Sequence, residues 1–128
     1  MKIKEILAAG RPSVSFEVFQ PKADASFEPI RAAVARLAQQ RPTFMSVTYG
    51  ASGNAQANTA EVAAFVQSLG VPALAHLTCV AASRDKIAEE TSALRAAGIE
   101  NILCLRGDLP RDLAEPPPGH FALTWDFS

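Results

Sequence analysis

The sequence has few of the residues that mark metal sites, disulfide frameworks or membrane spans. Of its 128 residues, 2 are cysteine and 2 are histidine, so we expect no zinc site or other metal centre. A membrane-spanning helix needs about 20 consecutive apolar residues, and no apolar run in the sequence approaches that length. The first ten residues are too charged for a signal peptide. The only cysteines in the sequence are Cys79 and Cys104. So few cysteines are typical of a protein in a reducing compartment, and we therefore expect a cytoplasmic protein.

An excess of charge of one sign is also missing. The 12 basic residues are balanced by 13 acidic ones, and the net charge is -1. A protein that binds nucleic acid or an anionic membrane usually carries a basic excess, so we expect neither partner. The composition is 48% hydrophobic and 20% charged, which is typical of one globular domain with a modest core.

Four short apolar runs divide the chain at regular intervals. They begin 30, 29 and 28 residues apart and are rich in strand-forming residues. Helical patterns lie between them, so the chain reads as repeated βα units on a parallel sheet. Two architectures remain open at this point, a doubly wound sheet and a (β/α)8 barrel of which four strands would be half. The runs are Val14–Phe19, Phe44–Tyr49, Ala73–Val80 and Asn101–Leu105.

Capping residues mark the ends of the expected helices. A short leading helix ends at Gly10, and three longer amphipathic helices follow the first three strands. Short polar residues favour helix starts, whereas glycine favours the residue after the last turn. The expected N-caps are Ser26, Asn58 and Ser83, and the expected stops are Gly70 and Gly98.

Polar side chains alternate with apolar ones inside each expected strand, and residues two apart share a face. A doubly wound sheet is covered by helices on both faces and needs both to be apolar. The inner face of a barrel becomes polar near the C-terminal mouth, where barrel active sites lie. The alternation therefore favours the barrel. The polar faces comprise Ser15 and Glu17, Ser46 and Thr48, His76 and Thr78, and, if the fourth strand extends that far, Cys104, Arg106 and Asp108.

Glu17 stands out among these residues, because a buried carboxylate without a partner is costly. One interpretation is that it points into a functional site. The other is a buried ion pair with Arg106. In the barrel, Glu17, Thr48, His76 and Asp108 would converge on one cavity near the C-terminal ends of the strands.

Four strings in this order and spacing resemble the N-terminal half of bacterial methylenetetrahydrofolate reductase. They are "SFEVFQPK", "FMSVTYGASG", "AHLTCV" and "NILCLRGDLP", and together they cover roughly residues 11–110. Each string alone is a weak signal, whereas four in register are specific. The first departs from the family pattern at Val18 and Gln20, where phenylalanine and proline are usual.

The resemblance implies an α/β chain that supplies about the first four βα units of a TIM barrel. It implies reduction of 5,10-methylenetetrahydrofolate to 5-methyltetrahydrofolate, with hydride passed from NAD(P)H through FAD. Glu17 matches the general acid that opens the methylene bridge, and a carboxylic acid does this best when burial raises its pKa. Asp108 matches the carboxylate beside the flavin and the folate. The positions that match the lining of the FAD and nicotinamide site are Thr48, Tyr49, Ala51, His76, Arg106, Gly107 and Asp108.

The resemblance fades after Pro110, and a full barrel takes about 250 residues. We therefore expect one partial barrel domain over residues 1–128, with an irregular tail at 111–128. The family is expected to form homo-oligomers. The half barrel is expected to associate or aggregate, because its edge strands are unpaired and it exposes inner-face residues such as Phe19 and Phe44. Two hypotheses stay open, a reductase completed by another chain and a non-catalytic fragment or small α/β binding module.

Overall fold

The computed structural model describes residues 1–19, 27–49, 56–80 and 82–108. Helices and strands alternate along this part of the chain, as the spacing of the apolar runs predicts. In chain order the elements are α1 (Ile3–Ala8), β1 (Ser15–Val18), α2 (Glu28–Ala38), β2 (Phe44–Val47), α3 (Gln56–Ser68), β3 (Ala73–Thr78), α4 (Arg84–Ala96) and β4 (Ile102–Leu105).

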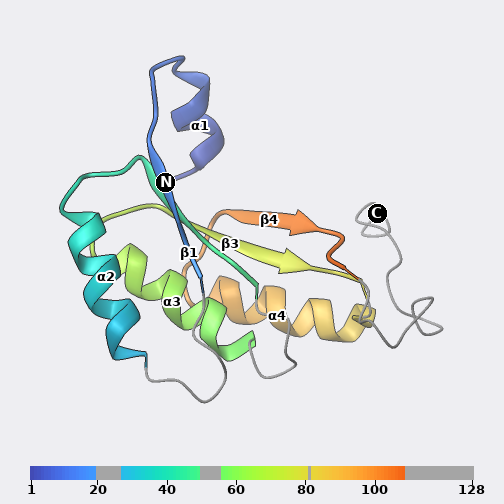
Figure 1. Cartoon of the computed structure of the whole chain (residues 1–128). Coiled ribbons are helices and arrows are strands. Elements are labelled where there is room, and N and C mark those ends of the chain that lie inside the picture. The colour runs from blue at the N-terminus through green and yellow to red at the C-terminus, as the bar shows by residue number, and fades with distance from the viewer. Residues whose placement is uncertain (20–26, 50–55, 81, 109–128) are drawn as a thin grey trace.

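The described strands form one parallel sheet in the order β1-β2-β3-β4. The helices α2, α3 and α4 lie against the same face of this sheet, and the opposite face is open (Figure 1). Strand order and helix cover both agree with the half barrel. A doubly wound sheet would carry helices on both faces, so that architecture is excluded for the described residues.

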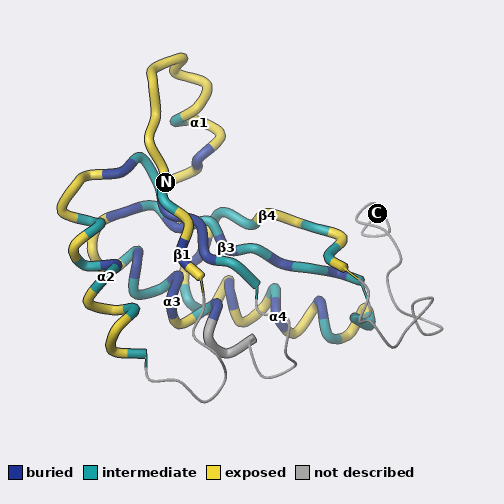
Figure 2. Tube along the Cα trace, in the orientation of Figure 1, coloured by how far each residue is buried: buried dark blue, intermediate teal, exposed yellow. Residues whose placement is uncertain are grey.

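The core lies between the sheet and the helices α2 and α3. The central strands contribute their helix-facing residues to it. Met45 and Val47 of β2 and Ala73 and Ala75 of β3 are 0% exposed, and Figure 2 shows these strands as the buried centre of the molecule. The small side chains of β3 leave room for the buried valines of α3 to pack closely. Because side chains alternate along a strand, the remaining residues of β2 and β3 point to the open face of the sheet.

The open face keeps several apolar side chains in contact with solvent. Phe19 is 70% exposed, as expected, and Phe44 is half-buried. Leu103 of β4 is 38% exposed. In the described residues, no helix is long and apolar enough to cross a membrane.

The fourth strand differs from its expected alternation. The register pairs Leu103 with His76 and Cys104 with Leu77. Because paired residues on parallel strands share a face, Leu103 lies on the open face, and Cys104 belongs to the helix side of the sheet. The expectation that Cys104 lies on the polar face is therefore wrong. The strand also ends at Leu105, so its alternation does not extend to Asp108.

Most of the helix boundaries that the structure describes match the expected caps. Ser83 caps α4, where its hydroxyl accepts a hydrogen bond from the Lys86 amide at 3.2 Å. Gly10, Gly70 and Gly98 have the positive φ typical of the residue after a helix. Asn58 is not an N-cap, because α3 already begins at Gln56. The expected cap Ser26 and the tail at 111–128 lie outside the described residues.

Candidate active site

Three polar side chains from neighbouring strands meet on the open face of the sheet. The Ser46 hydroxyl lies 3.4 Å from Glu17 Oε2, to which it donates a hydrogen bond. His76 Nε2 lies 3.9 Å from the same carboxylate oxygen. Glu17 and His76 therefore come together as expected from the sequence, and among the described residues Glu17 has His76, not Arg106, within ion-pairing distance.

The sheet register explains why these side chains meet. Glu17 of β1 is directly opposite Ser46 of β2, and Ser46 is opposite Leu74 of β3. His76 is two residues beyond Leu74 on the same face, so it reaches Glu17 diagonally across β2. The group lies toward the C-terminal ends of the strands, which is the end where barrel active sites form.

Solvent exposure differs between the two titratable members of this group. The Glu17 side chain is 46% exposed, whereas the His76 side chain is 11% exposed. His76 Nε2 is buried and has no hydrogen-bond partner among the described residues. The His76–Glu17 contact is an ion pair only when the imidazole is protonated. The group thus combines a solvent-accessible carboxylate with a buried imidazole nitrogen whose hydrogen-bonding capacity is not satisfied by the described residues.

The residues that follow β2 take different directions. The Thr48 amide donates to the Val18 carbonyl at 3.0 Å and continues the ladder past the end of the strand. Thr48 is therefore next to the Glu17 group in the sheet. The Tyr49 side chain packs on the helix side, where its hydroxyl donates to both oxygens of Glu90 at 2.8 and 2.9 Å. Ala51 lies outside the described residues.

The chain after β4 passes very close to β3. Gly107 has a φ of +79°, and a Cβ there would lie 3.0 Å from Thr78 Cβ and 3.1 Å from Val80 Cγ1. Only glycine fits both the backbone conformation and the space. The Arg106 carbonyl accepts from the Val80 amide at 2.7 Å, and the Arg106 Nε donates to the Gly107 carbonyl at 3.1 Å.

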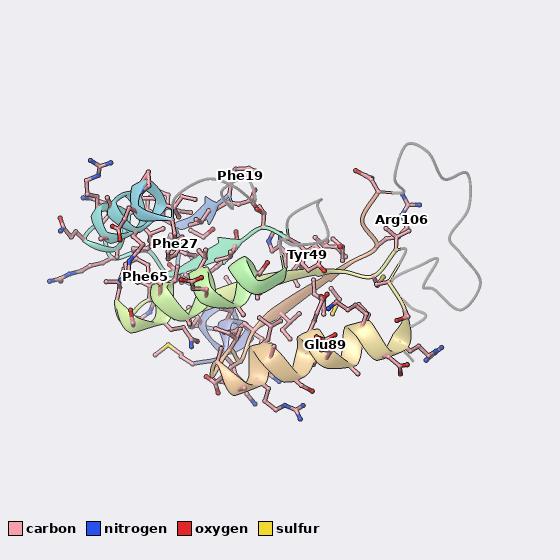
Figure 3. All side chains as sticks on the ribbon, turned by 90° about the horizontal axis from the view of Figure 1, so that it is seen from below. Phe19, Phe27, Tyr49, Phe65, Glu89 and Arg106 are labelled. Atoms are coloured by element: carbon pink, nitrogen blue, oxygen red, sulfur yellow. The ribbon has the colours of Figure 1, made fainter. Side chains whose placement is uncertain are left out.

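Arg106 and Asp108 do not join the Glu17 group through any contact among the described residues. Arg106 lies at the far end of the sheet from α2 (Figure 3), and Asp108 is exposed. Their roles at a shared site remain expectations that follow from the resemblance.

Sequence reasoning overlooked two residues of this region as site candidates. Ser46 was placed on the correct face, but its contact with Glu17 depends on the register between β1 and β2. Glu90 is 8% exposed and its pKa is raised by burial, although the hydrogen bond from Tyr49 lowers it in part. A signal for Glu90 was present, because it interrupts the apolar stripe between Ile87 and Leu94 on α4.

Comparisons with known proteins place the chain in a family. The family model for methylenetetrahydrofolate reductase matches residues 2–127. The 5,10-methylenetetrahydrofolate reductase of Pectobacterium carotovorum subsp. carotovorum is 37% identical over 108 residues, which cover 84% of this chain and 36% of that protein. Methylenetetrahydrofolate reductase (NADH) 1 of Arabidopsis thaliana is 36% identical over 128 residues, which cover 98% of this chain and 22% of that protein.

The chain thus spans about a third or less of the curated relatives that it matches. The 5,10-methylenetetrahydrofolate reductase of Escherichia coli (strain K12) gives the same picture, with 33% identity over 84% of this chain and 36% of its own length. The matched family is built on a TIM barrel, and the parallel sheet with helices on one face agrees with half of such a barrel. The chain therefore belongs to the methylenetetrahydrofolate reductase family.

Proposed function

We propose that this chain carries the proton-donating part of an active site that reduces 5,10-methylenetetrahydrofolate to 5-methyltetrahydrofolate. The observation that carries the proposal is the Glu17 carboxylate on the open face of the sheet, within 3.4 Å of the Ser46 hydroxyl and 3.9 Å of His76 Nε2. An acid on the inner face of a barrel, toward the C-terminal ends of the strands, occupies the usual place of a barrel catalyst.

Glu17 would act as a general acid on the folate. In its protonated form it donates a proton to one nitrogen of the methylene bridge, and the bond between that nitrogen and the bridging carbon breaks. The electron pair of the broken bond stays on the protonated nitrogen, while the lone pair of the other bridge nitrogen forms a double bond to the carbon. The resulting iminium accepts hydride at that carbon. Ser46 donates a hydrogen bond to Glu17 Oε2 and His76 Nε2 lies 3.9 Å from the same oxygen, so we expect Oε1 to face the substrate.

FAD is the cofactor that we propose, and its bound flavin would supply the hydride that originates from NAD(P)H. The relatives from Arabidopsis thaliana and Oryza sativa are named for NADH. His76 fits such a ligand, because its buried Nε2 lacks a hydrogen-bond partner among the described residues. Gly107 would act indirectly, because its missing side chain lets the segment after β4 pack closely against Thr78 and Val80. The proposed cofactor residues are Thr48, Tyr49, Ala51, His76, Arg106, Gly107 and Asp108.

The proposal is tested by completing the barrel. A chimera would join residues 1–108 of this chain to the remainder of the Pectobacterium relative. We expect the chimera to bind FAD and to oxidise NAD(P)H with the folate acceptor. We expect the 128-residue chain alone to bind FAD weakly or not at all and to show no folate reduction, because no described strand lies opposite its open face.

Two outcomes would contradict this proposal. A folded chimera that binds neither FAD nor folate would favour the alternative, a non-catalytic fragment or small binding module. A yellow, active preparation of the 128-residue chain would show that four strands suffice for the site.

A further inference from the structure

Glu90 of α4 is a buried carboxylate that the proposed proton chemistry does not use. It is 8% exposed, and both of its oxygens accept from the single hydroxyl of Tyr49, at 2.8 and 2.9 Å. Burial raises the pKa of Glu90, while the Tyr49 hydrogen bond and the charge of Lys86 lower it. A well-packed apolar side chain would occupy this position at a lower cost, so packing alone does not explain a glutamate here.

Tyr49 connects this carboxylate to the end of β2. The strand ends at Val47, and the Thr48 amide makes the next ladder bond to the Val18 carbonyl at 3.0 Å. The Tyr49 ring then packs on the second core cluster, formed by Leu77, Cys79 and Ile87. Its hydroxyl reaches Glu90 on α4, the helix that also carries the Glu89 labelled in Figure 3.

The space beside the Tyr49–Glu90 pair is too small for a ligand of its own. The cavity there measures about 20 Å³ and is lined by Tyr49, Thr59, His76, Glu90 and apolar residues of α3, β3 and α4. That volume holds about one water molecule. We therefore expect the role of the Tyr49–Glu90 pair to lie in the position of the segment after β2, and not in the binding of a ligand at this cavity.

We propose that Glu90 is a positioning residue for the cofactor-binding end of β2, and that it acts through Tyr49. The inference rests on the proposed function, in which Thr48 and Tyr49 belong to the FAD site. Glu90 is on a helix that packs on the far side of the sheet, so its hydrogen bonds tie the segment after β2 to a fixed element. Held in this way, the main chain of Thr48 and Tyr49 keeps one place at the edge of the open face.

Amide hydrogen exchange on the 128-residue chain tests the inference without any cofactor. Glu90→Ala and Tyr49→Phe each remove one partner, and we expect the Thr48 amide to exchange about tenfold faster relative to the Met45 amide of the core. Glu90→Gln keeps an oxygen that accepts from Tyr49, so we expect it to stay near the wild-type ratio. The matched control is Glu89→Ala, which alters the neighbouring side chain, 70% exposed and bound to Lys86, and leaves the ratio unchanged.

The ratio of the two exchange rates separates positioning from general stability. Equal acceleration of the Thr48 and Met45 amides in Glu90→Ala would overturn the inference, as would an unchanged ratio in Tyr49→Phe. If Glu90→Ala does not fold, Tyr49→Phe and Glu90→Gln decide the question in the same way.

FAD titration of the chimera with the same substitutions tests the link to the cofactor. We expect Glu90→Ala and Tyr49→Phe to weaken FAD binding about tenfold and Glu90→Gln to restore it. Unchanged affinity in both would overturn the link between Glu90 and the cofactor site. If the unsubstituted chimera binds no FAD, the proposed function fails, while the exchange ratio still decides whether Glu90 positions the end of β2.

Discussion

The carboxylates of Glu17 and Glu90 lie on opposite sides of the sheet, one on β1 and the other on α4. They differ in solvent exposure and in hydrogen-bond partners. The Glu17 side chain is 46% exposed, so solvent reaches it, as would the proposed folate substrate. Glu90 of α4 is buried and accepts a hydrogen bond from the Tyr49 hydroxyl. The alternation of β1 was enough to predict the face on which Glu17 lies. The Ser46 contact was not predictable, because it depends on the register between two strands that are 29 residues apart.

The raised pKa of Glu90 predicts a specific pH dependence of stability. Because the folded-state pKa lies above the ordinary value of 4.5, the folded protein binds this proton more tightly than the unfolded chain does. Stability that depends on Glu90 is therefore greatest below the ordinary value and is lost as the pH rises toward the raised pKa. Urea unfolding of wild type and Glu90→Gln at pH values from about 4 to about 8 measures how the unfolding free energy of each protein changes across that window.

We expect the difference in unfolding free energy between Glu90→Gln and wild type to grow in favour of the variant as the pH rises through that window. Glu100 contributes in the opposite direction, because its hydrogen bond with the N-terminal ammonium lowers its pKa. That contribution is common to both proteins and cancels in the comparison. A difference that is constant with pH would contradict the raised pKa.

At the scale of the element, local signals predicted the helices and strands well, and tertiary contacts decided the exceptions. Ser83 caps α4 as its position predicts. Asn58 is a residue type that favours helix starts, but α3 begins two residues earlier, at Gln56. The face of Leu103 and Cys104 could not be read from a strand as short as β4, because the sequence contains apolar residues on both of its faces.

Gly107 provides the clearest element-scale prediction. In Gly107→Ala, the left-handed backbone costs about 1–2 kcal/mol, and the new Cβ would also press on Thr78 and Val80. We expect a larger loss of unfolding free energy than in Gly70→Ala, whose glycine has a similar φ of +80° but nothing within 4 Å. Urea unfolding measures both variants. Equal losses would show that the contact between the segment after β4 and β3 is not tight.

At the scale of the whole molecule, the sheet formed by the described residues has two edge strands, neither of which pairs with a further described strand, and one open face. The described strands end at β1 on one side and β4 on the other, and the face between them exposes Phe19 and Leu103. Unpaired parallel edges next to apolar surface promote association. The spacing of the apolar runs alone left two architectures open, whereas the polar residues on one face of each strand favoured the barrel and the four strings in register identified the family.

We expect the isolated 128-residue chain to associate in a concentration-dependent manner through the open face. Leu103→Lys places a charge on that face at the β4 edge and should shift the protein toward the monomer in sedimentation or light scattering. The control is Leu69→Lys, because Leu69 lies just after α3 and is 37% exposed, close to the 38% of Leu103. If both variants associate as strongly as wild type, the open face is not the surface that drives association.

The most direct test of the proposed active site is a comparison of the two half-reactions in the chimera with Glu17→Gln. A general acid that acts on the folate is needed only when the folate is reduced, and its loss typically costs about 10²–10⁴-fold in rate. We predict that reduction of the bound flavin by NAD(P)H keeps nearly its full rate, while flavin oxidation by 5,10-methylenetetrahydrofolate slows by about that factor. Folate reduction at the unsubstituted rate would contradict the assignment of Glu17 as the proton donor.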